Sequence, residues 1–333
     1  MPRVSTANAV IAAIVVVRLL VPLAIPRWPL LIVVALLADA FDNTFLRLFT
    51  EVDLGPDGPY QSFDKALDIY YLAIAYETTL RNWTSLAAIR VARFLFYYRL
   101  VGVLVFELSG WRGALLLFPN TFEFFFIAYE LIRVRFDPAR RPAHFWVWLA
   151  AGLWILVKLP QEYWIHVAQL DFTDAVADHP WFGVLCAVGL LGLAAVFWWV
   201  VRPRLPAPDH PARFAADPVT FTGRSRHIVE PALLLGLMSI IFAEILTAVT
   251  LTALEVAIGV AAIVAIGALL AGRLPFVARL ALNLALVYVG SRLLSDADDF
   301  PLATGLFFAL LITLLTWLYE TYRPVHDARF AGG

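Results

Sequence analysis

The stretch that organises the chain is ADAFDNTFLR, residues 38–47, followed after a short polar loop by YQSFDKALD, residues 60–68. The first run closes one apolar segment, and the second run opens the next one. Between them lies a loop rich in Gly and Pro, which interrupts helix. Acidic side chains therefore gather at the adjoining ends of two apolar segments. The four acids are Asp39, Asp42, Asp64 and Asp68.

The spacing of these acids predicts a metal site. Asp39 and Asp42 are three residues apart and Asp64 and Asp68 are four apart, so on helices each pair shares one face. Several carboxylates in or near hydrocarbon repel one another and are costly unless a positive charge lies between them. Oxygen ligands converging from two helices suit a hard divalent cation, Mg²⁺ or Mn²⁺, and favour a pair of such ions.

Composition places the chain in a membrane. Of its 333 residues, 62% are hydrophobic and only 15% are charged, which is far more apolar than a soluble domain of this length needs. Several stretches reach the length of about 18 apolar residues that crosses a bilayer as a helix. We therefore expect an all-α, polytopic transmembrane bundle, a multi-pass integral membrane protein. The net charge of −1, with no basic patch interleaved with aromatics, gives no indication of nucleic-acid binding.

Hydropathy divides the chain into about 10–11 membrane segments. The fifth is expected to break at Pro119-Asn120, and a polar tail is expected from Glu320 to Gly333. A basic, proline-rich linker over residues 202–228 is the clearest boundary. The expected segments are 7–25, 30–39, 62–80, 84–107, 112–133, 145–167, 181–201, 229–249, 252–271, 275–294 and 301–320.

The orientation of these segments depends on how the first five are counted. The positive-inside rule places the basic loops 133–144 and 202–226 in the cytoplasm and the acidic loop 168–180 outside. Simple alternation then places the aspartates outside. If residues 84–99, whose arginines interrupt an apolar helix, lie at the interface instead of crossing, the aspartates share the side of the basic loops.

The acidic cluster resembles the signature of the CDP-alcohol phosphatidyltransferase family, which reads D-x-x-D-G-x-x-A-R, then G-x-x-x-D-x-x-x-D. All four acids and Arg47 match it in order, at the end of the second segment and the start of the third. Asn43, Leu46 and Tyr60 stand where the family has glycine, alanine and glycine. The larger Leu and Tyr side chains are expected to reshape the space beside a bound nucleotide.

The resemblance implies a six-span phosphatidyltransferase-like core, a membrane lipid and a CDP-linked donor as partners, and a homodimer. Beyond the core, the extension is open to interpretation as a wall of the active site, a dimerisation surface or an unrelated module. The expected divisions are the core at 1–170, an additional span at 171–201, the linker at 202–228 and C-terminal membrane helices at 229–322.

The resemblance also implies the chemistry, which is transfer of a phosphatidyl or phospho-alcohol group to an alcohol with release of CMP. Asp68 would take the proton from the incoming hydroxyl, and Arg47 would hold a phosphate oxygen. Asn43 and Lys65 would join Arg47 in binding the substrate. Two ions, Mg²⁺ or Mn²⁺, would offset charge on the diphosphate. Their ligands would be Asp39, Asp42, Asp64 and Asp68.

Two other functions compete with this hypothesis. The chain is open to interpretation as a relative that keeps the fold and binds lipid or metal without catalysis, or as a transporter that uses buried acids. Lys158, Glu162 and His166, at successive helical turns, are secondary candidates for a head-group site or a proton path. The alternative for Lys158 and Glu162 is an ion pair that neutralises itself. We expect Glu123 and Glu130 to pair with Arg90, Arg93 or Arg99.

Overall fold

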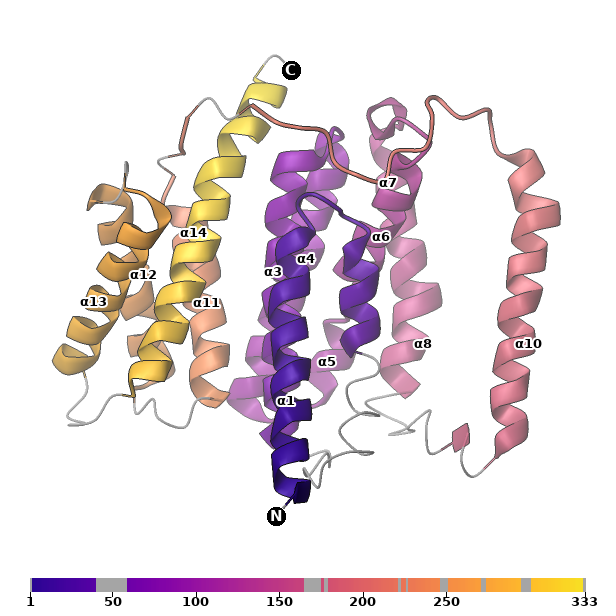
Figure 1. The fold of residues 1–333 in the computed structure, drawn as a ribbon. Helices are drawn as coiled ribbons and strands as arrows, with labels where there is room; N and C mark the ends of the chain where they lie inside the picture. Colours follow the sequence, from indigo (N-terminus) through magenta and orange to yellow (C-terminus); the bar gives the residue numbers. More distant parts are fainter. Residues whose placement is uncertain are drawn as a thin grey trace.

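The computed structural model describes residues 2–39, 59–164, 175–176, 179–220, 223–225, 227–245, 251–270, 274–294 and 301–331. Over these ranges the chain is largely helical and contains no strand, which confirms the predicted all-α bundle (Figure 1). Within them, six helices are long and apolar enough to cross a bilayer, from the Gly113–Arg133 segment to the Leu302–Phe330 segment. The protein is therefore a multi-pass integral membrane protein.

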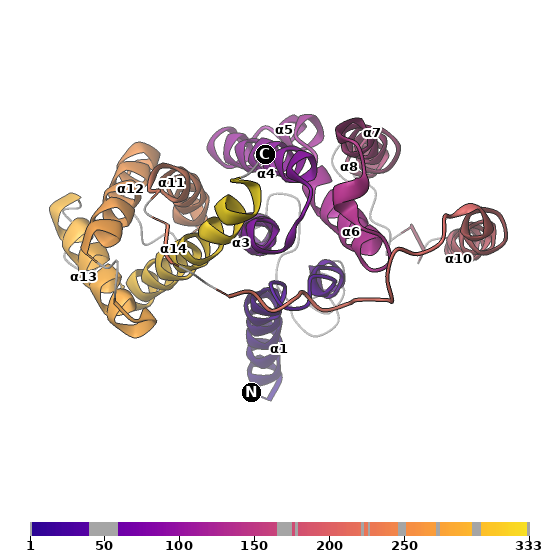
Figure 2. The same cartoon turned by 90° about the horizontal axis from the view of Figure 1, so that it is seen from above.

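Helix α3, Pro59–Asn82, stands at the centre of the bundle. Side chains from Ala66 to Leu80 are buried all round the helix, because other helices cover every side (Figure 2). The neighbours in contact with α3 are α1 (Pro2–Leu20), α4 (Leu86–Ser109), α6 (Thr121–Arg133), α11 (Val229–Ile245) and α14 (Leu302–Phe330). A helix buried on every face is normally apolar throughout. This one carries Asp68, Glu77 and Arg81, and each of these groups needs a polar partner or must give up its charge.

Local sequence explains the breaks in the N-terminal half. Helix α1 continues into a 3₁₀ turn, η1 (Val21–Ala24), and a further helix covers residues 31–39. Helix α4 ends at Gly110, whose φ of 65° suits glycine. The predicted break at Pro119-Asn120 is confirmed, because it separates α5 (Gly113–Leu117) from α6.

The next segment is irregular for a similar reason. A 3₁₀ turn, η2 (Pro138–Arg140), leads into α7 (Ala143–Leu153). A π-helical turn, η3 (Trp154–Lys158), then joins α7 to α8 (Leu159–Glu162). Pro160 has no N–H to continue the regular ladder, which is a common cause of such a bulge.

The C-terminal helices pack on the core helix itself. In this half, α12 (Ala253–Leu270) and α13 (Phe276–Leu294) lie outside α11 and α14, and both α11 and α14 contact α3. The apolar helix α10 (Pro180–Val196) stands apart from this assembly with its π-helical end η5 (Phe197–Val201) and the short turn η6 (Arg202–Arg204) (Figures 1 and 2). The extension is thus continuous with the core around α3.

One expectation about the chain path is wrong. The expected polar tail is helical to Phe330, since α14 continues through Pro324 and an Arg323–Asp327 pair at 2.8 Å bridges one turn beyond it. Residues 86–99 lie on α4, which has 24 residues and runs beside α3 and α6. Their position relative to the membrane stays a prediction.

An extended segment, residues 205–220, crosses one end of the bundle between α10 and α11 (Figure 1). We call this segment the strap. Backbone hydrogen bonds fix it at both ends, from Asp209 N to Arg135 O at 3.0 Å and from Ala216 N to Arg27 O at 2.9 Å. Because backbone polar groups need partners, these bonds hold an otherwise irregular chain against the helix ends. The strap brings its charged residues over the end of α3.

Candidate functional site

The structure brings together Asp39 and Asp68, two of the predicted metal ligands. Asp39 ends the described part of the helix at residues 31–39, and Asp68 lies ten residues into α3. Both carboxylates accept hydrogen bonds from the same nitrogen, Nη2 of Arg18, at 2.6 Å for Asp39 and 2.8 Å for Asp68. Arg18 is 4% exposed and Asp68 is 7% exposed. The convergence of acids predicted from the sequence therefore includes a buried cation.

The positive charge of Arg18 offsets the repulsion between Asp39 and Asp68. The sequence predicted that metal ions would supply this charge. One guanidinium shared by two carboxylates leaves this trio with a net negative charge, and such buried charges are stable only when they are paired. The two carboxylate oxygens are close enough to share one nitrogen, so their arrangement also suits one shared cation of another kind. Their donor chemistry, oxygen only, fits Mg²⁺ or Mn²⁺. A metal ion and the Arg18 guanidinium would compete for the same oxygens.

Several predicted residues lie outside the part of the chain that the structure describes. These are Asp42, Asn43, Arg47 and His166. Asp64 lies on α3, one turn before Asp68, but its side chain is outside the described set, and Lys65 follows it as a half-buried residue. Among the described side chains, no group of three or more His, Cys, Asp and Glu residues is placed to hold a metal. The four-carboxylate site therefore stays a prediction.

A line of buried polar residues leads away from Asp68. Tyr71, one turn further along α3, donates a hydrogen bond to Glu123 on α6 at 2.5 Å. The side chain of Asn120 donates to the same Glu123 at 3.1 Å, and its backbone N–H points to Glu162 at 3.4 Å. Glu162 lies 3.7 Å from Lys158, so these two secondary candidates form the predicted pair and join the line. Both are 4% exposed.

The expected arginine partners of Glu123 and Glu130 are wrong. Glu123 bonds to Tyr71 and Asn120, whereas Glu130 accepts from Nε of Arg133 at 2.5 Å and from the Trp83 indole at 2.9 Å. Arg133 lies three residues after Glu130 on the same helix, so a local pair forms without the longer reach to α4.

A second buried cluster surrounds Glu230 at the start of α11. Its carboxylate accepts from the hydroxyls of Tyr76 and Tyr319 and lies 3.1 Å from Arg323 and 3.3 Å from Arg93. Glu77, fully buried on α3, has no hydrogen-bond partner for either carboxylate oxygen within the described part of the chain. The cluster lies beside a cavity of about 360 Å³ between α4, α11 and α14. Sequence reasoning did not single out Glu77 or Glu230.

The sequence contained a signal for Glu77 and for a partner of Arg18. Arg18 interrupts an apolar segment, and Glu77 lies inside another, in a chain that is only 15% charged. A charged group at such a position needs a partner of opposite charge or must give up its own charge. That rule predicts a carboxylate near Arg18, although it does not identify which one.

Comparisons with known proteins add no assignment to this geometry. No family model, no curated protein and no solved structure matches the chain. The function must therefore be inferred from the described residues.

Proposed function

We propose that this protein is an integral membrane phosphotransferase. It would move a phosphatidyl or phospho-alcohol group from a CDP-linked donor to an alcohol, with CMP as the leaving group. The observation that supports this proposal is the meeting of Asp39 and Asp68, from two different helices, on one nitrogen of the buried Arg18. A cluster that concentrates negative charge beside hydrocarbon is suited to hold a cation and, through it, a diphosphate.

Each residue has a distinct part in this proposal. Asp39 and Asp68, with Asp42 and Asp64, would hold Mg²⁺ or Mn²⁺, which would offset the charge developing on the diphosphate. Asp68 would accept the proton of the alcohol as its oxygen bonds to phosphorus and the bond to the CMP oxygen breaks. Arg47 would hold a phosphate oxygen, together with Asn43 and Lys65 on the substrate. Arg18 would move off Asp39 and Asp68 when the cation binds.

The test measures CMP release from CDP-diacylglycerol by the purified protein in detergent, with Mn²⁺ or Mg²⁺ and a panel of alcohols. Asp68→Asn should lower the rate about a hundredfold or more, the usual minimum for losing a general base. Asp327→Asn is the matched control, because Asp327 pairs with Arg323 at the far end of α14. Undiminished activity of Asp68→Asn, with a folded wild type as reference, would rule out this mechanism.

A specific observation favours each alternative. Arg18 already answers the Asp39 and Asp68 charges, as a non-catalytic, lipid-binding or metal-binding relative would require. Metal binding without CMP release would support that function. Glu77 and the Glu230 cluster, buried between α3, α4, α11 and α14, are the groups a transporter would use. Substrate flux into liposomes without chemistry would support transport. In a bacterial cell, we propose the plasma membrane as the location.

A further inference from the structure

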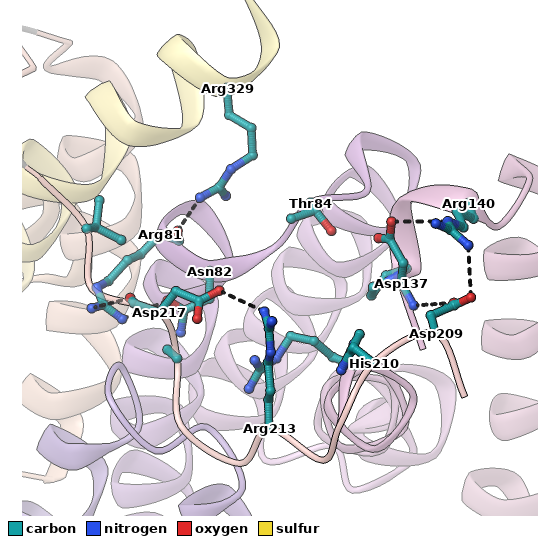
Figure 3. A pocket seen from close by; sticks show the side chains of 14 residues that line it. Arg81, Asn82, Thr84, Asp137, Arg140, Asp209, His210, Arg213, Asp217 and Arg329 are labelled. Carbon is teal, nitrogen blue, oxygen red and sulfur yellow. Dashed lines mark hydrogen bonds and ion pairs between the residues drawn. The ribbon is translucent and has the colours of Figure 1, made fainter. Parts of the chain in front are cut away.

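At the opposite end of α3 from Asp68, a polar cavity of about 310 Å³ opens beneath the strap (Figure 3). Its walls come from the end of α3, the end of α6 with the following loop, the strap and the end of α14. The lining includes five arginines against three aspartates. The arginines are Arg81, Arg133, Arg140, Arg213 and Arg329, and the acids are Asp137, Asp209 and Asp217.

The three acids are committed to the rim of the cavity. Asp209 lies 2.9 Å from Arg140, which also lies 3.6 Å from Asp137. Asp217 lies 3.9 Å from Arg213, and both side chains are more than half exposed. The Asp209–Arg140 pair links the strap to the loop after α6, and the three pairs neutralise Arg140 and Arg213. Arg81 and Arg329 therefore have no acidic partner from the strap.

Arg81 and Arg329 are held by neutral oxygens. Arg81, 8% exposed, donates to the backbone carbonyls of Pro26 and Asp217 and to the side-chain carbonyl of Asn82 at 2.7 Å. Arg329 donates to the carbonyls of Trp83 at 2.5 Å and Arg81 at 2.9 Å. Among the described residues, no carboxylate lies within ion-pair distance, 4.0 Å, of either guanidinium. Two adjacent positive charges therefore face each other across one end of α3.

Donor capacity remains for a ligand. A guanidinium carries five N–H donors, more than the backbone carbonyls use at Arg329. Within the described chain, Nη2 of Arg133 is buried without a hydrogen-bond partner, and Arg133 lines the same cavity. Planar guanidiniums bind phosphate oxygens in pairs, and the cavity volume lies near the lower end of small-ligand sites, at about 300 Å³.

We propose that this cavity binds a phosphate monoester or another compact phosphate anion, with Arg81 and Arg329 as its main ligands and Arg133 as a third donor. The anion supplies the negative charge that Arg81 and Arg329 lack, and the strap covers it. The phosphate is carried either by a soluble molecule or by a lipid such as phosphatidic acid, since the cavity opens at the end of the bundle. The site is separate from the aspartates and does not depend on CMP chemistry.

The experiment measures the thermal unfolding midpoint of the full chain by tryptophan fluorescence, because a ligand of the native state raises it. One arm titrates inorganic phosphate and pyrophosphate in detergent against sodium chloride at equal ionic strength. The other compares nanodiscs of phosphatidylcholine with nanodiscs that also contain phosphatidic acid. Stabilisation by the soluble anions identifies a free phosphate ligand, whereas stabilisation by phosphatidic acid alone identifies the lipid head group.

Variants distinguish the cavity from general charge. Arg329→Gln should raise the phosphate concentration needed for half of the stabilisation about tenfold or more, because charge-assisted hydrogen bonds to the anion are lost. Arg329 is exposed at the end of α14, so this variant retains the packed core. Arg292→Gln is the matched control, because Arg292 is an exposed arginine on α13 outside the cavity. No stabilisation in either arm, or an equal loss in both variants, would overturn the proposal.

Discussion

The two ends of α3 use arginine in opposite ways. Towards its start, two carboxylates, Asp39 and Asp68, share the single guanidinium of Arg18. Arg81 lies thirteen residues after Asp68 on α3, about 20 Å away at the helical rise. There, Arg81 and Arg329 of α14 are held by carbonyl oxygens. The trio of Arg18, Asp39 and Asp68 carries more negative charge than positive, and the described lining of the cavity at the second end carries more positive charge than negative. One buried helix thus connects two sites with opposite charge imbalance.

This difference indicates what each end can bind. A buried charge is stable only if another charge or enough hydrogen bonds replace its lost hydration. At the acidic end a cation improves the balance, and Arg18 already supplies one. At the basic end an anion would improve the charge balance, and without one the carbonyl oxygens hold the arginines. The proposed ligands, a divalent cation at one end and a phosphate anion at the other, follow from this asymmetry.

The largest expected effect is at Arg18. Arg18→Gln removes the positive partner of Asp39 and Asp68 and should destabilise the protein by about 3–5 kcal/mol, as breaking a buried ion pair does. Added Mn²⁺ should restore more of the thermal unfolding midpoint in Arg18→Gln than it adds to the wild type, since the guanidinium no longer competes for the carboxylates.

Arg292→Gln is again the control, because this exposed arginine on α13 contacts the Tyr288 ring on the same helix. The measurement is thermal unfolding in EDTA and in millimolar Mn²⁺. An Arg18→Gln variant as stable as the wild type in EDTA would show that the acidic end does not need this cation. A variant that Mn²⁺ leaves unchanged would remove the metal from the proposal.

The sequence was sufficient to predict the membrane bundle and the convergence of Asp39 with Asp68. Hydrophobic length determines where a helix crosses, and the loop between the second and third segments brings their adjoining ends, which carry the acids, near each other, so both predictions rest on local pattern. The identity of the positive partner was not accessible in this way. Arg18 reaches Asp68 across 50 residues of chain, whereas the sequence predicted metal ions as the positive charge.

The basic end was harder to predict because no local pattern contains it. Arg329 donates a hydrogen bond to the carbonyl of Arg81, 248 residues away in the chain. The sequence predicted a polar tail from Glu320 onwards and therefore did not place Arg329 at the end of a helix. The sequence shows that the linker is basic and proline-rich, but its path over α3 depends on tertiary hydrogen bonds to Arg27 and Arg135. Contacts of this kind become visible only when the helix ends are assembled.

A smaller effect is expected at Arg81. Arg81→Gln removes a nearly buried guanidinium and its bonds to Pro26 and Asn82, and it should cost about 1.5–3 kcal/mol, the range for hydrogen bonds to charged groups. The cost should be smaller than that of Arg18→Gln, because no carboxylate is left unpaired. Thermal unfolding of both variants in the same buffer tests this order.

Adding phosphate to the same unfolding measurement tests whether Arg81 binds the anion. If the anion binds between Arg81 and Arg329, saturating phosphate should enlarge the difference between the wild type and Arg81→Gln, since only the wild type gains the ligand's stabilisation. A greater loss for Arg81→Gln than for Arg18→Gln in phosphate-free EDTA would reverse the comparison between the two ends of α3.

The smallest effect is expected at the strap. The backbone N–H of Asp137 donates to Asp209, and this bond, with help from the Arg140 charge, lowers the pKa of Asp209 below the usual range for aspartate. A lowered folded-state pKa means that the carboxylate stabilises the strap above its unfolded pKa, and that this contribution is lost as the pH falls through the lowered value. At neutral pH the interaction is fully present.

Asp209→Asn should therefore release the strap without unfolding the bundle. Hydrogen exchange at pH 7 should become faster at the Asp137 and Asp209 amides, whereas the amides of α3 should keep their wild-type protection. Asp327→Asn, at a half-buried ion pair on α14, serves as the control. Because the strap forms one wall of the arginine cavity, Asp209→Asn should also weaken phosphate binding, although it removes a negative charge that would otherwise repel the anion. Tighter phosphate binding in this variant would mean that net charge, and not the closed cavity, governs the basic end.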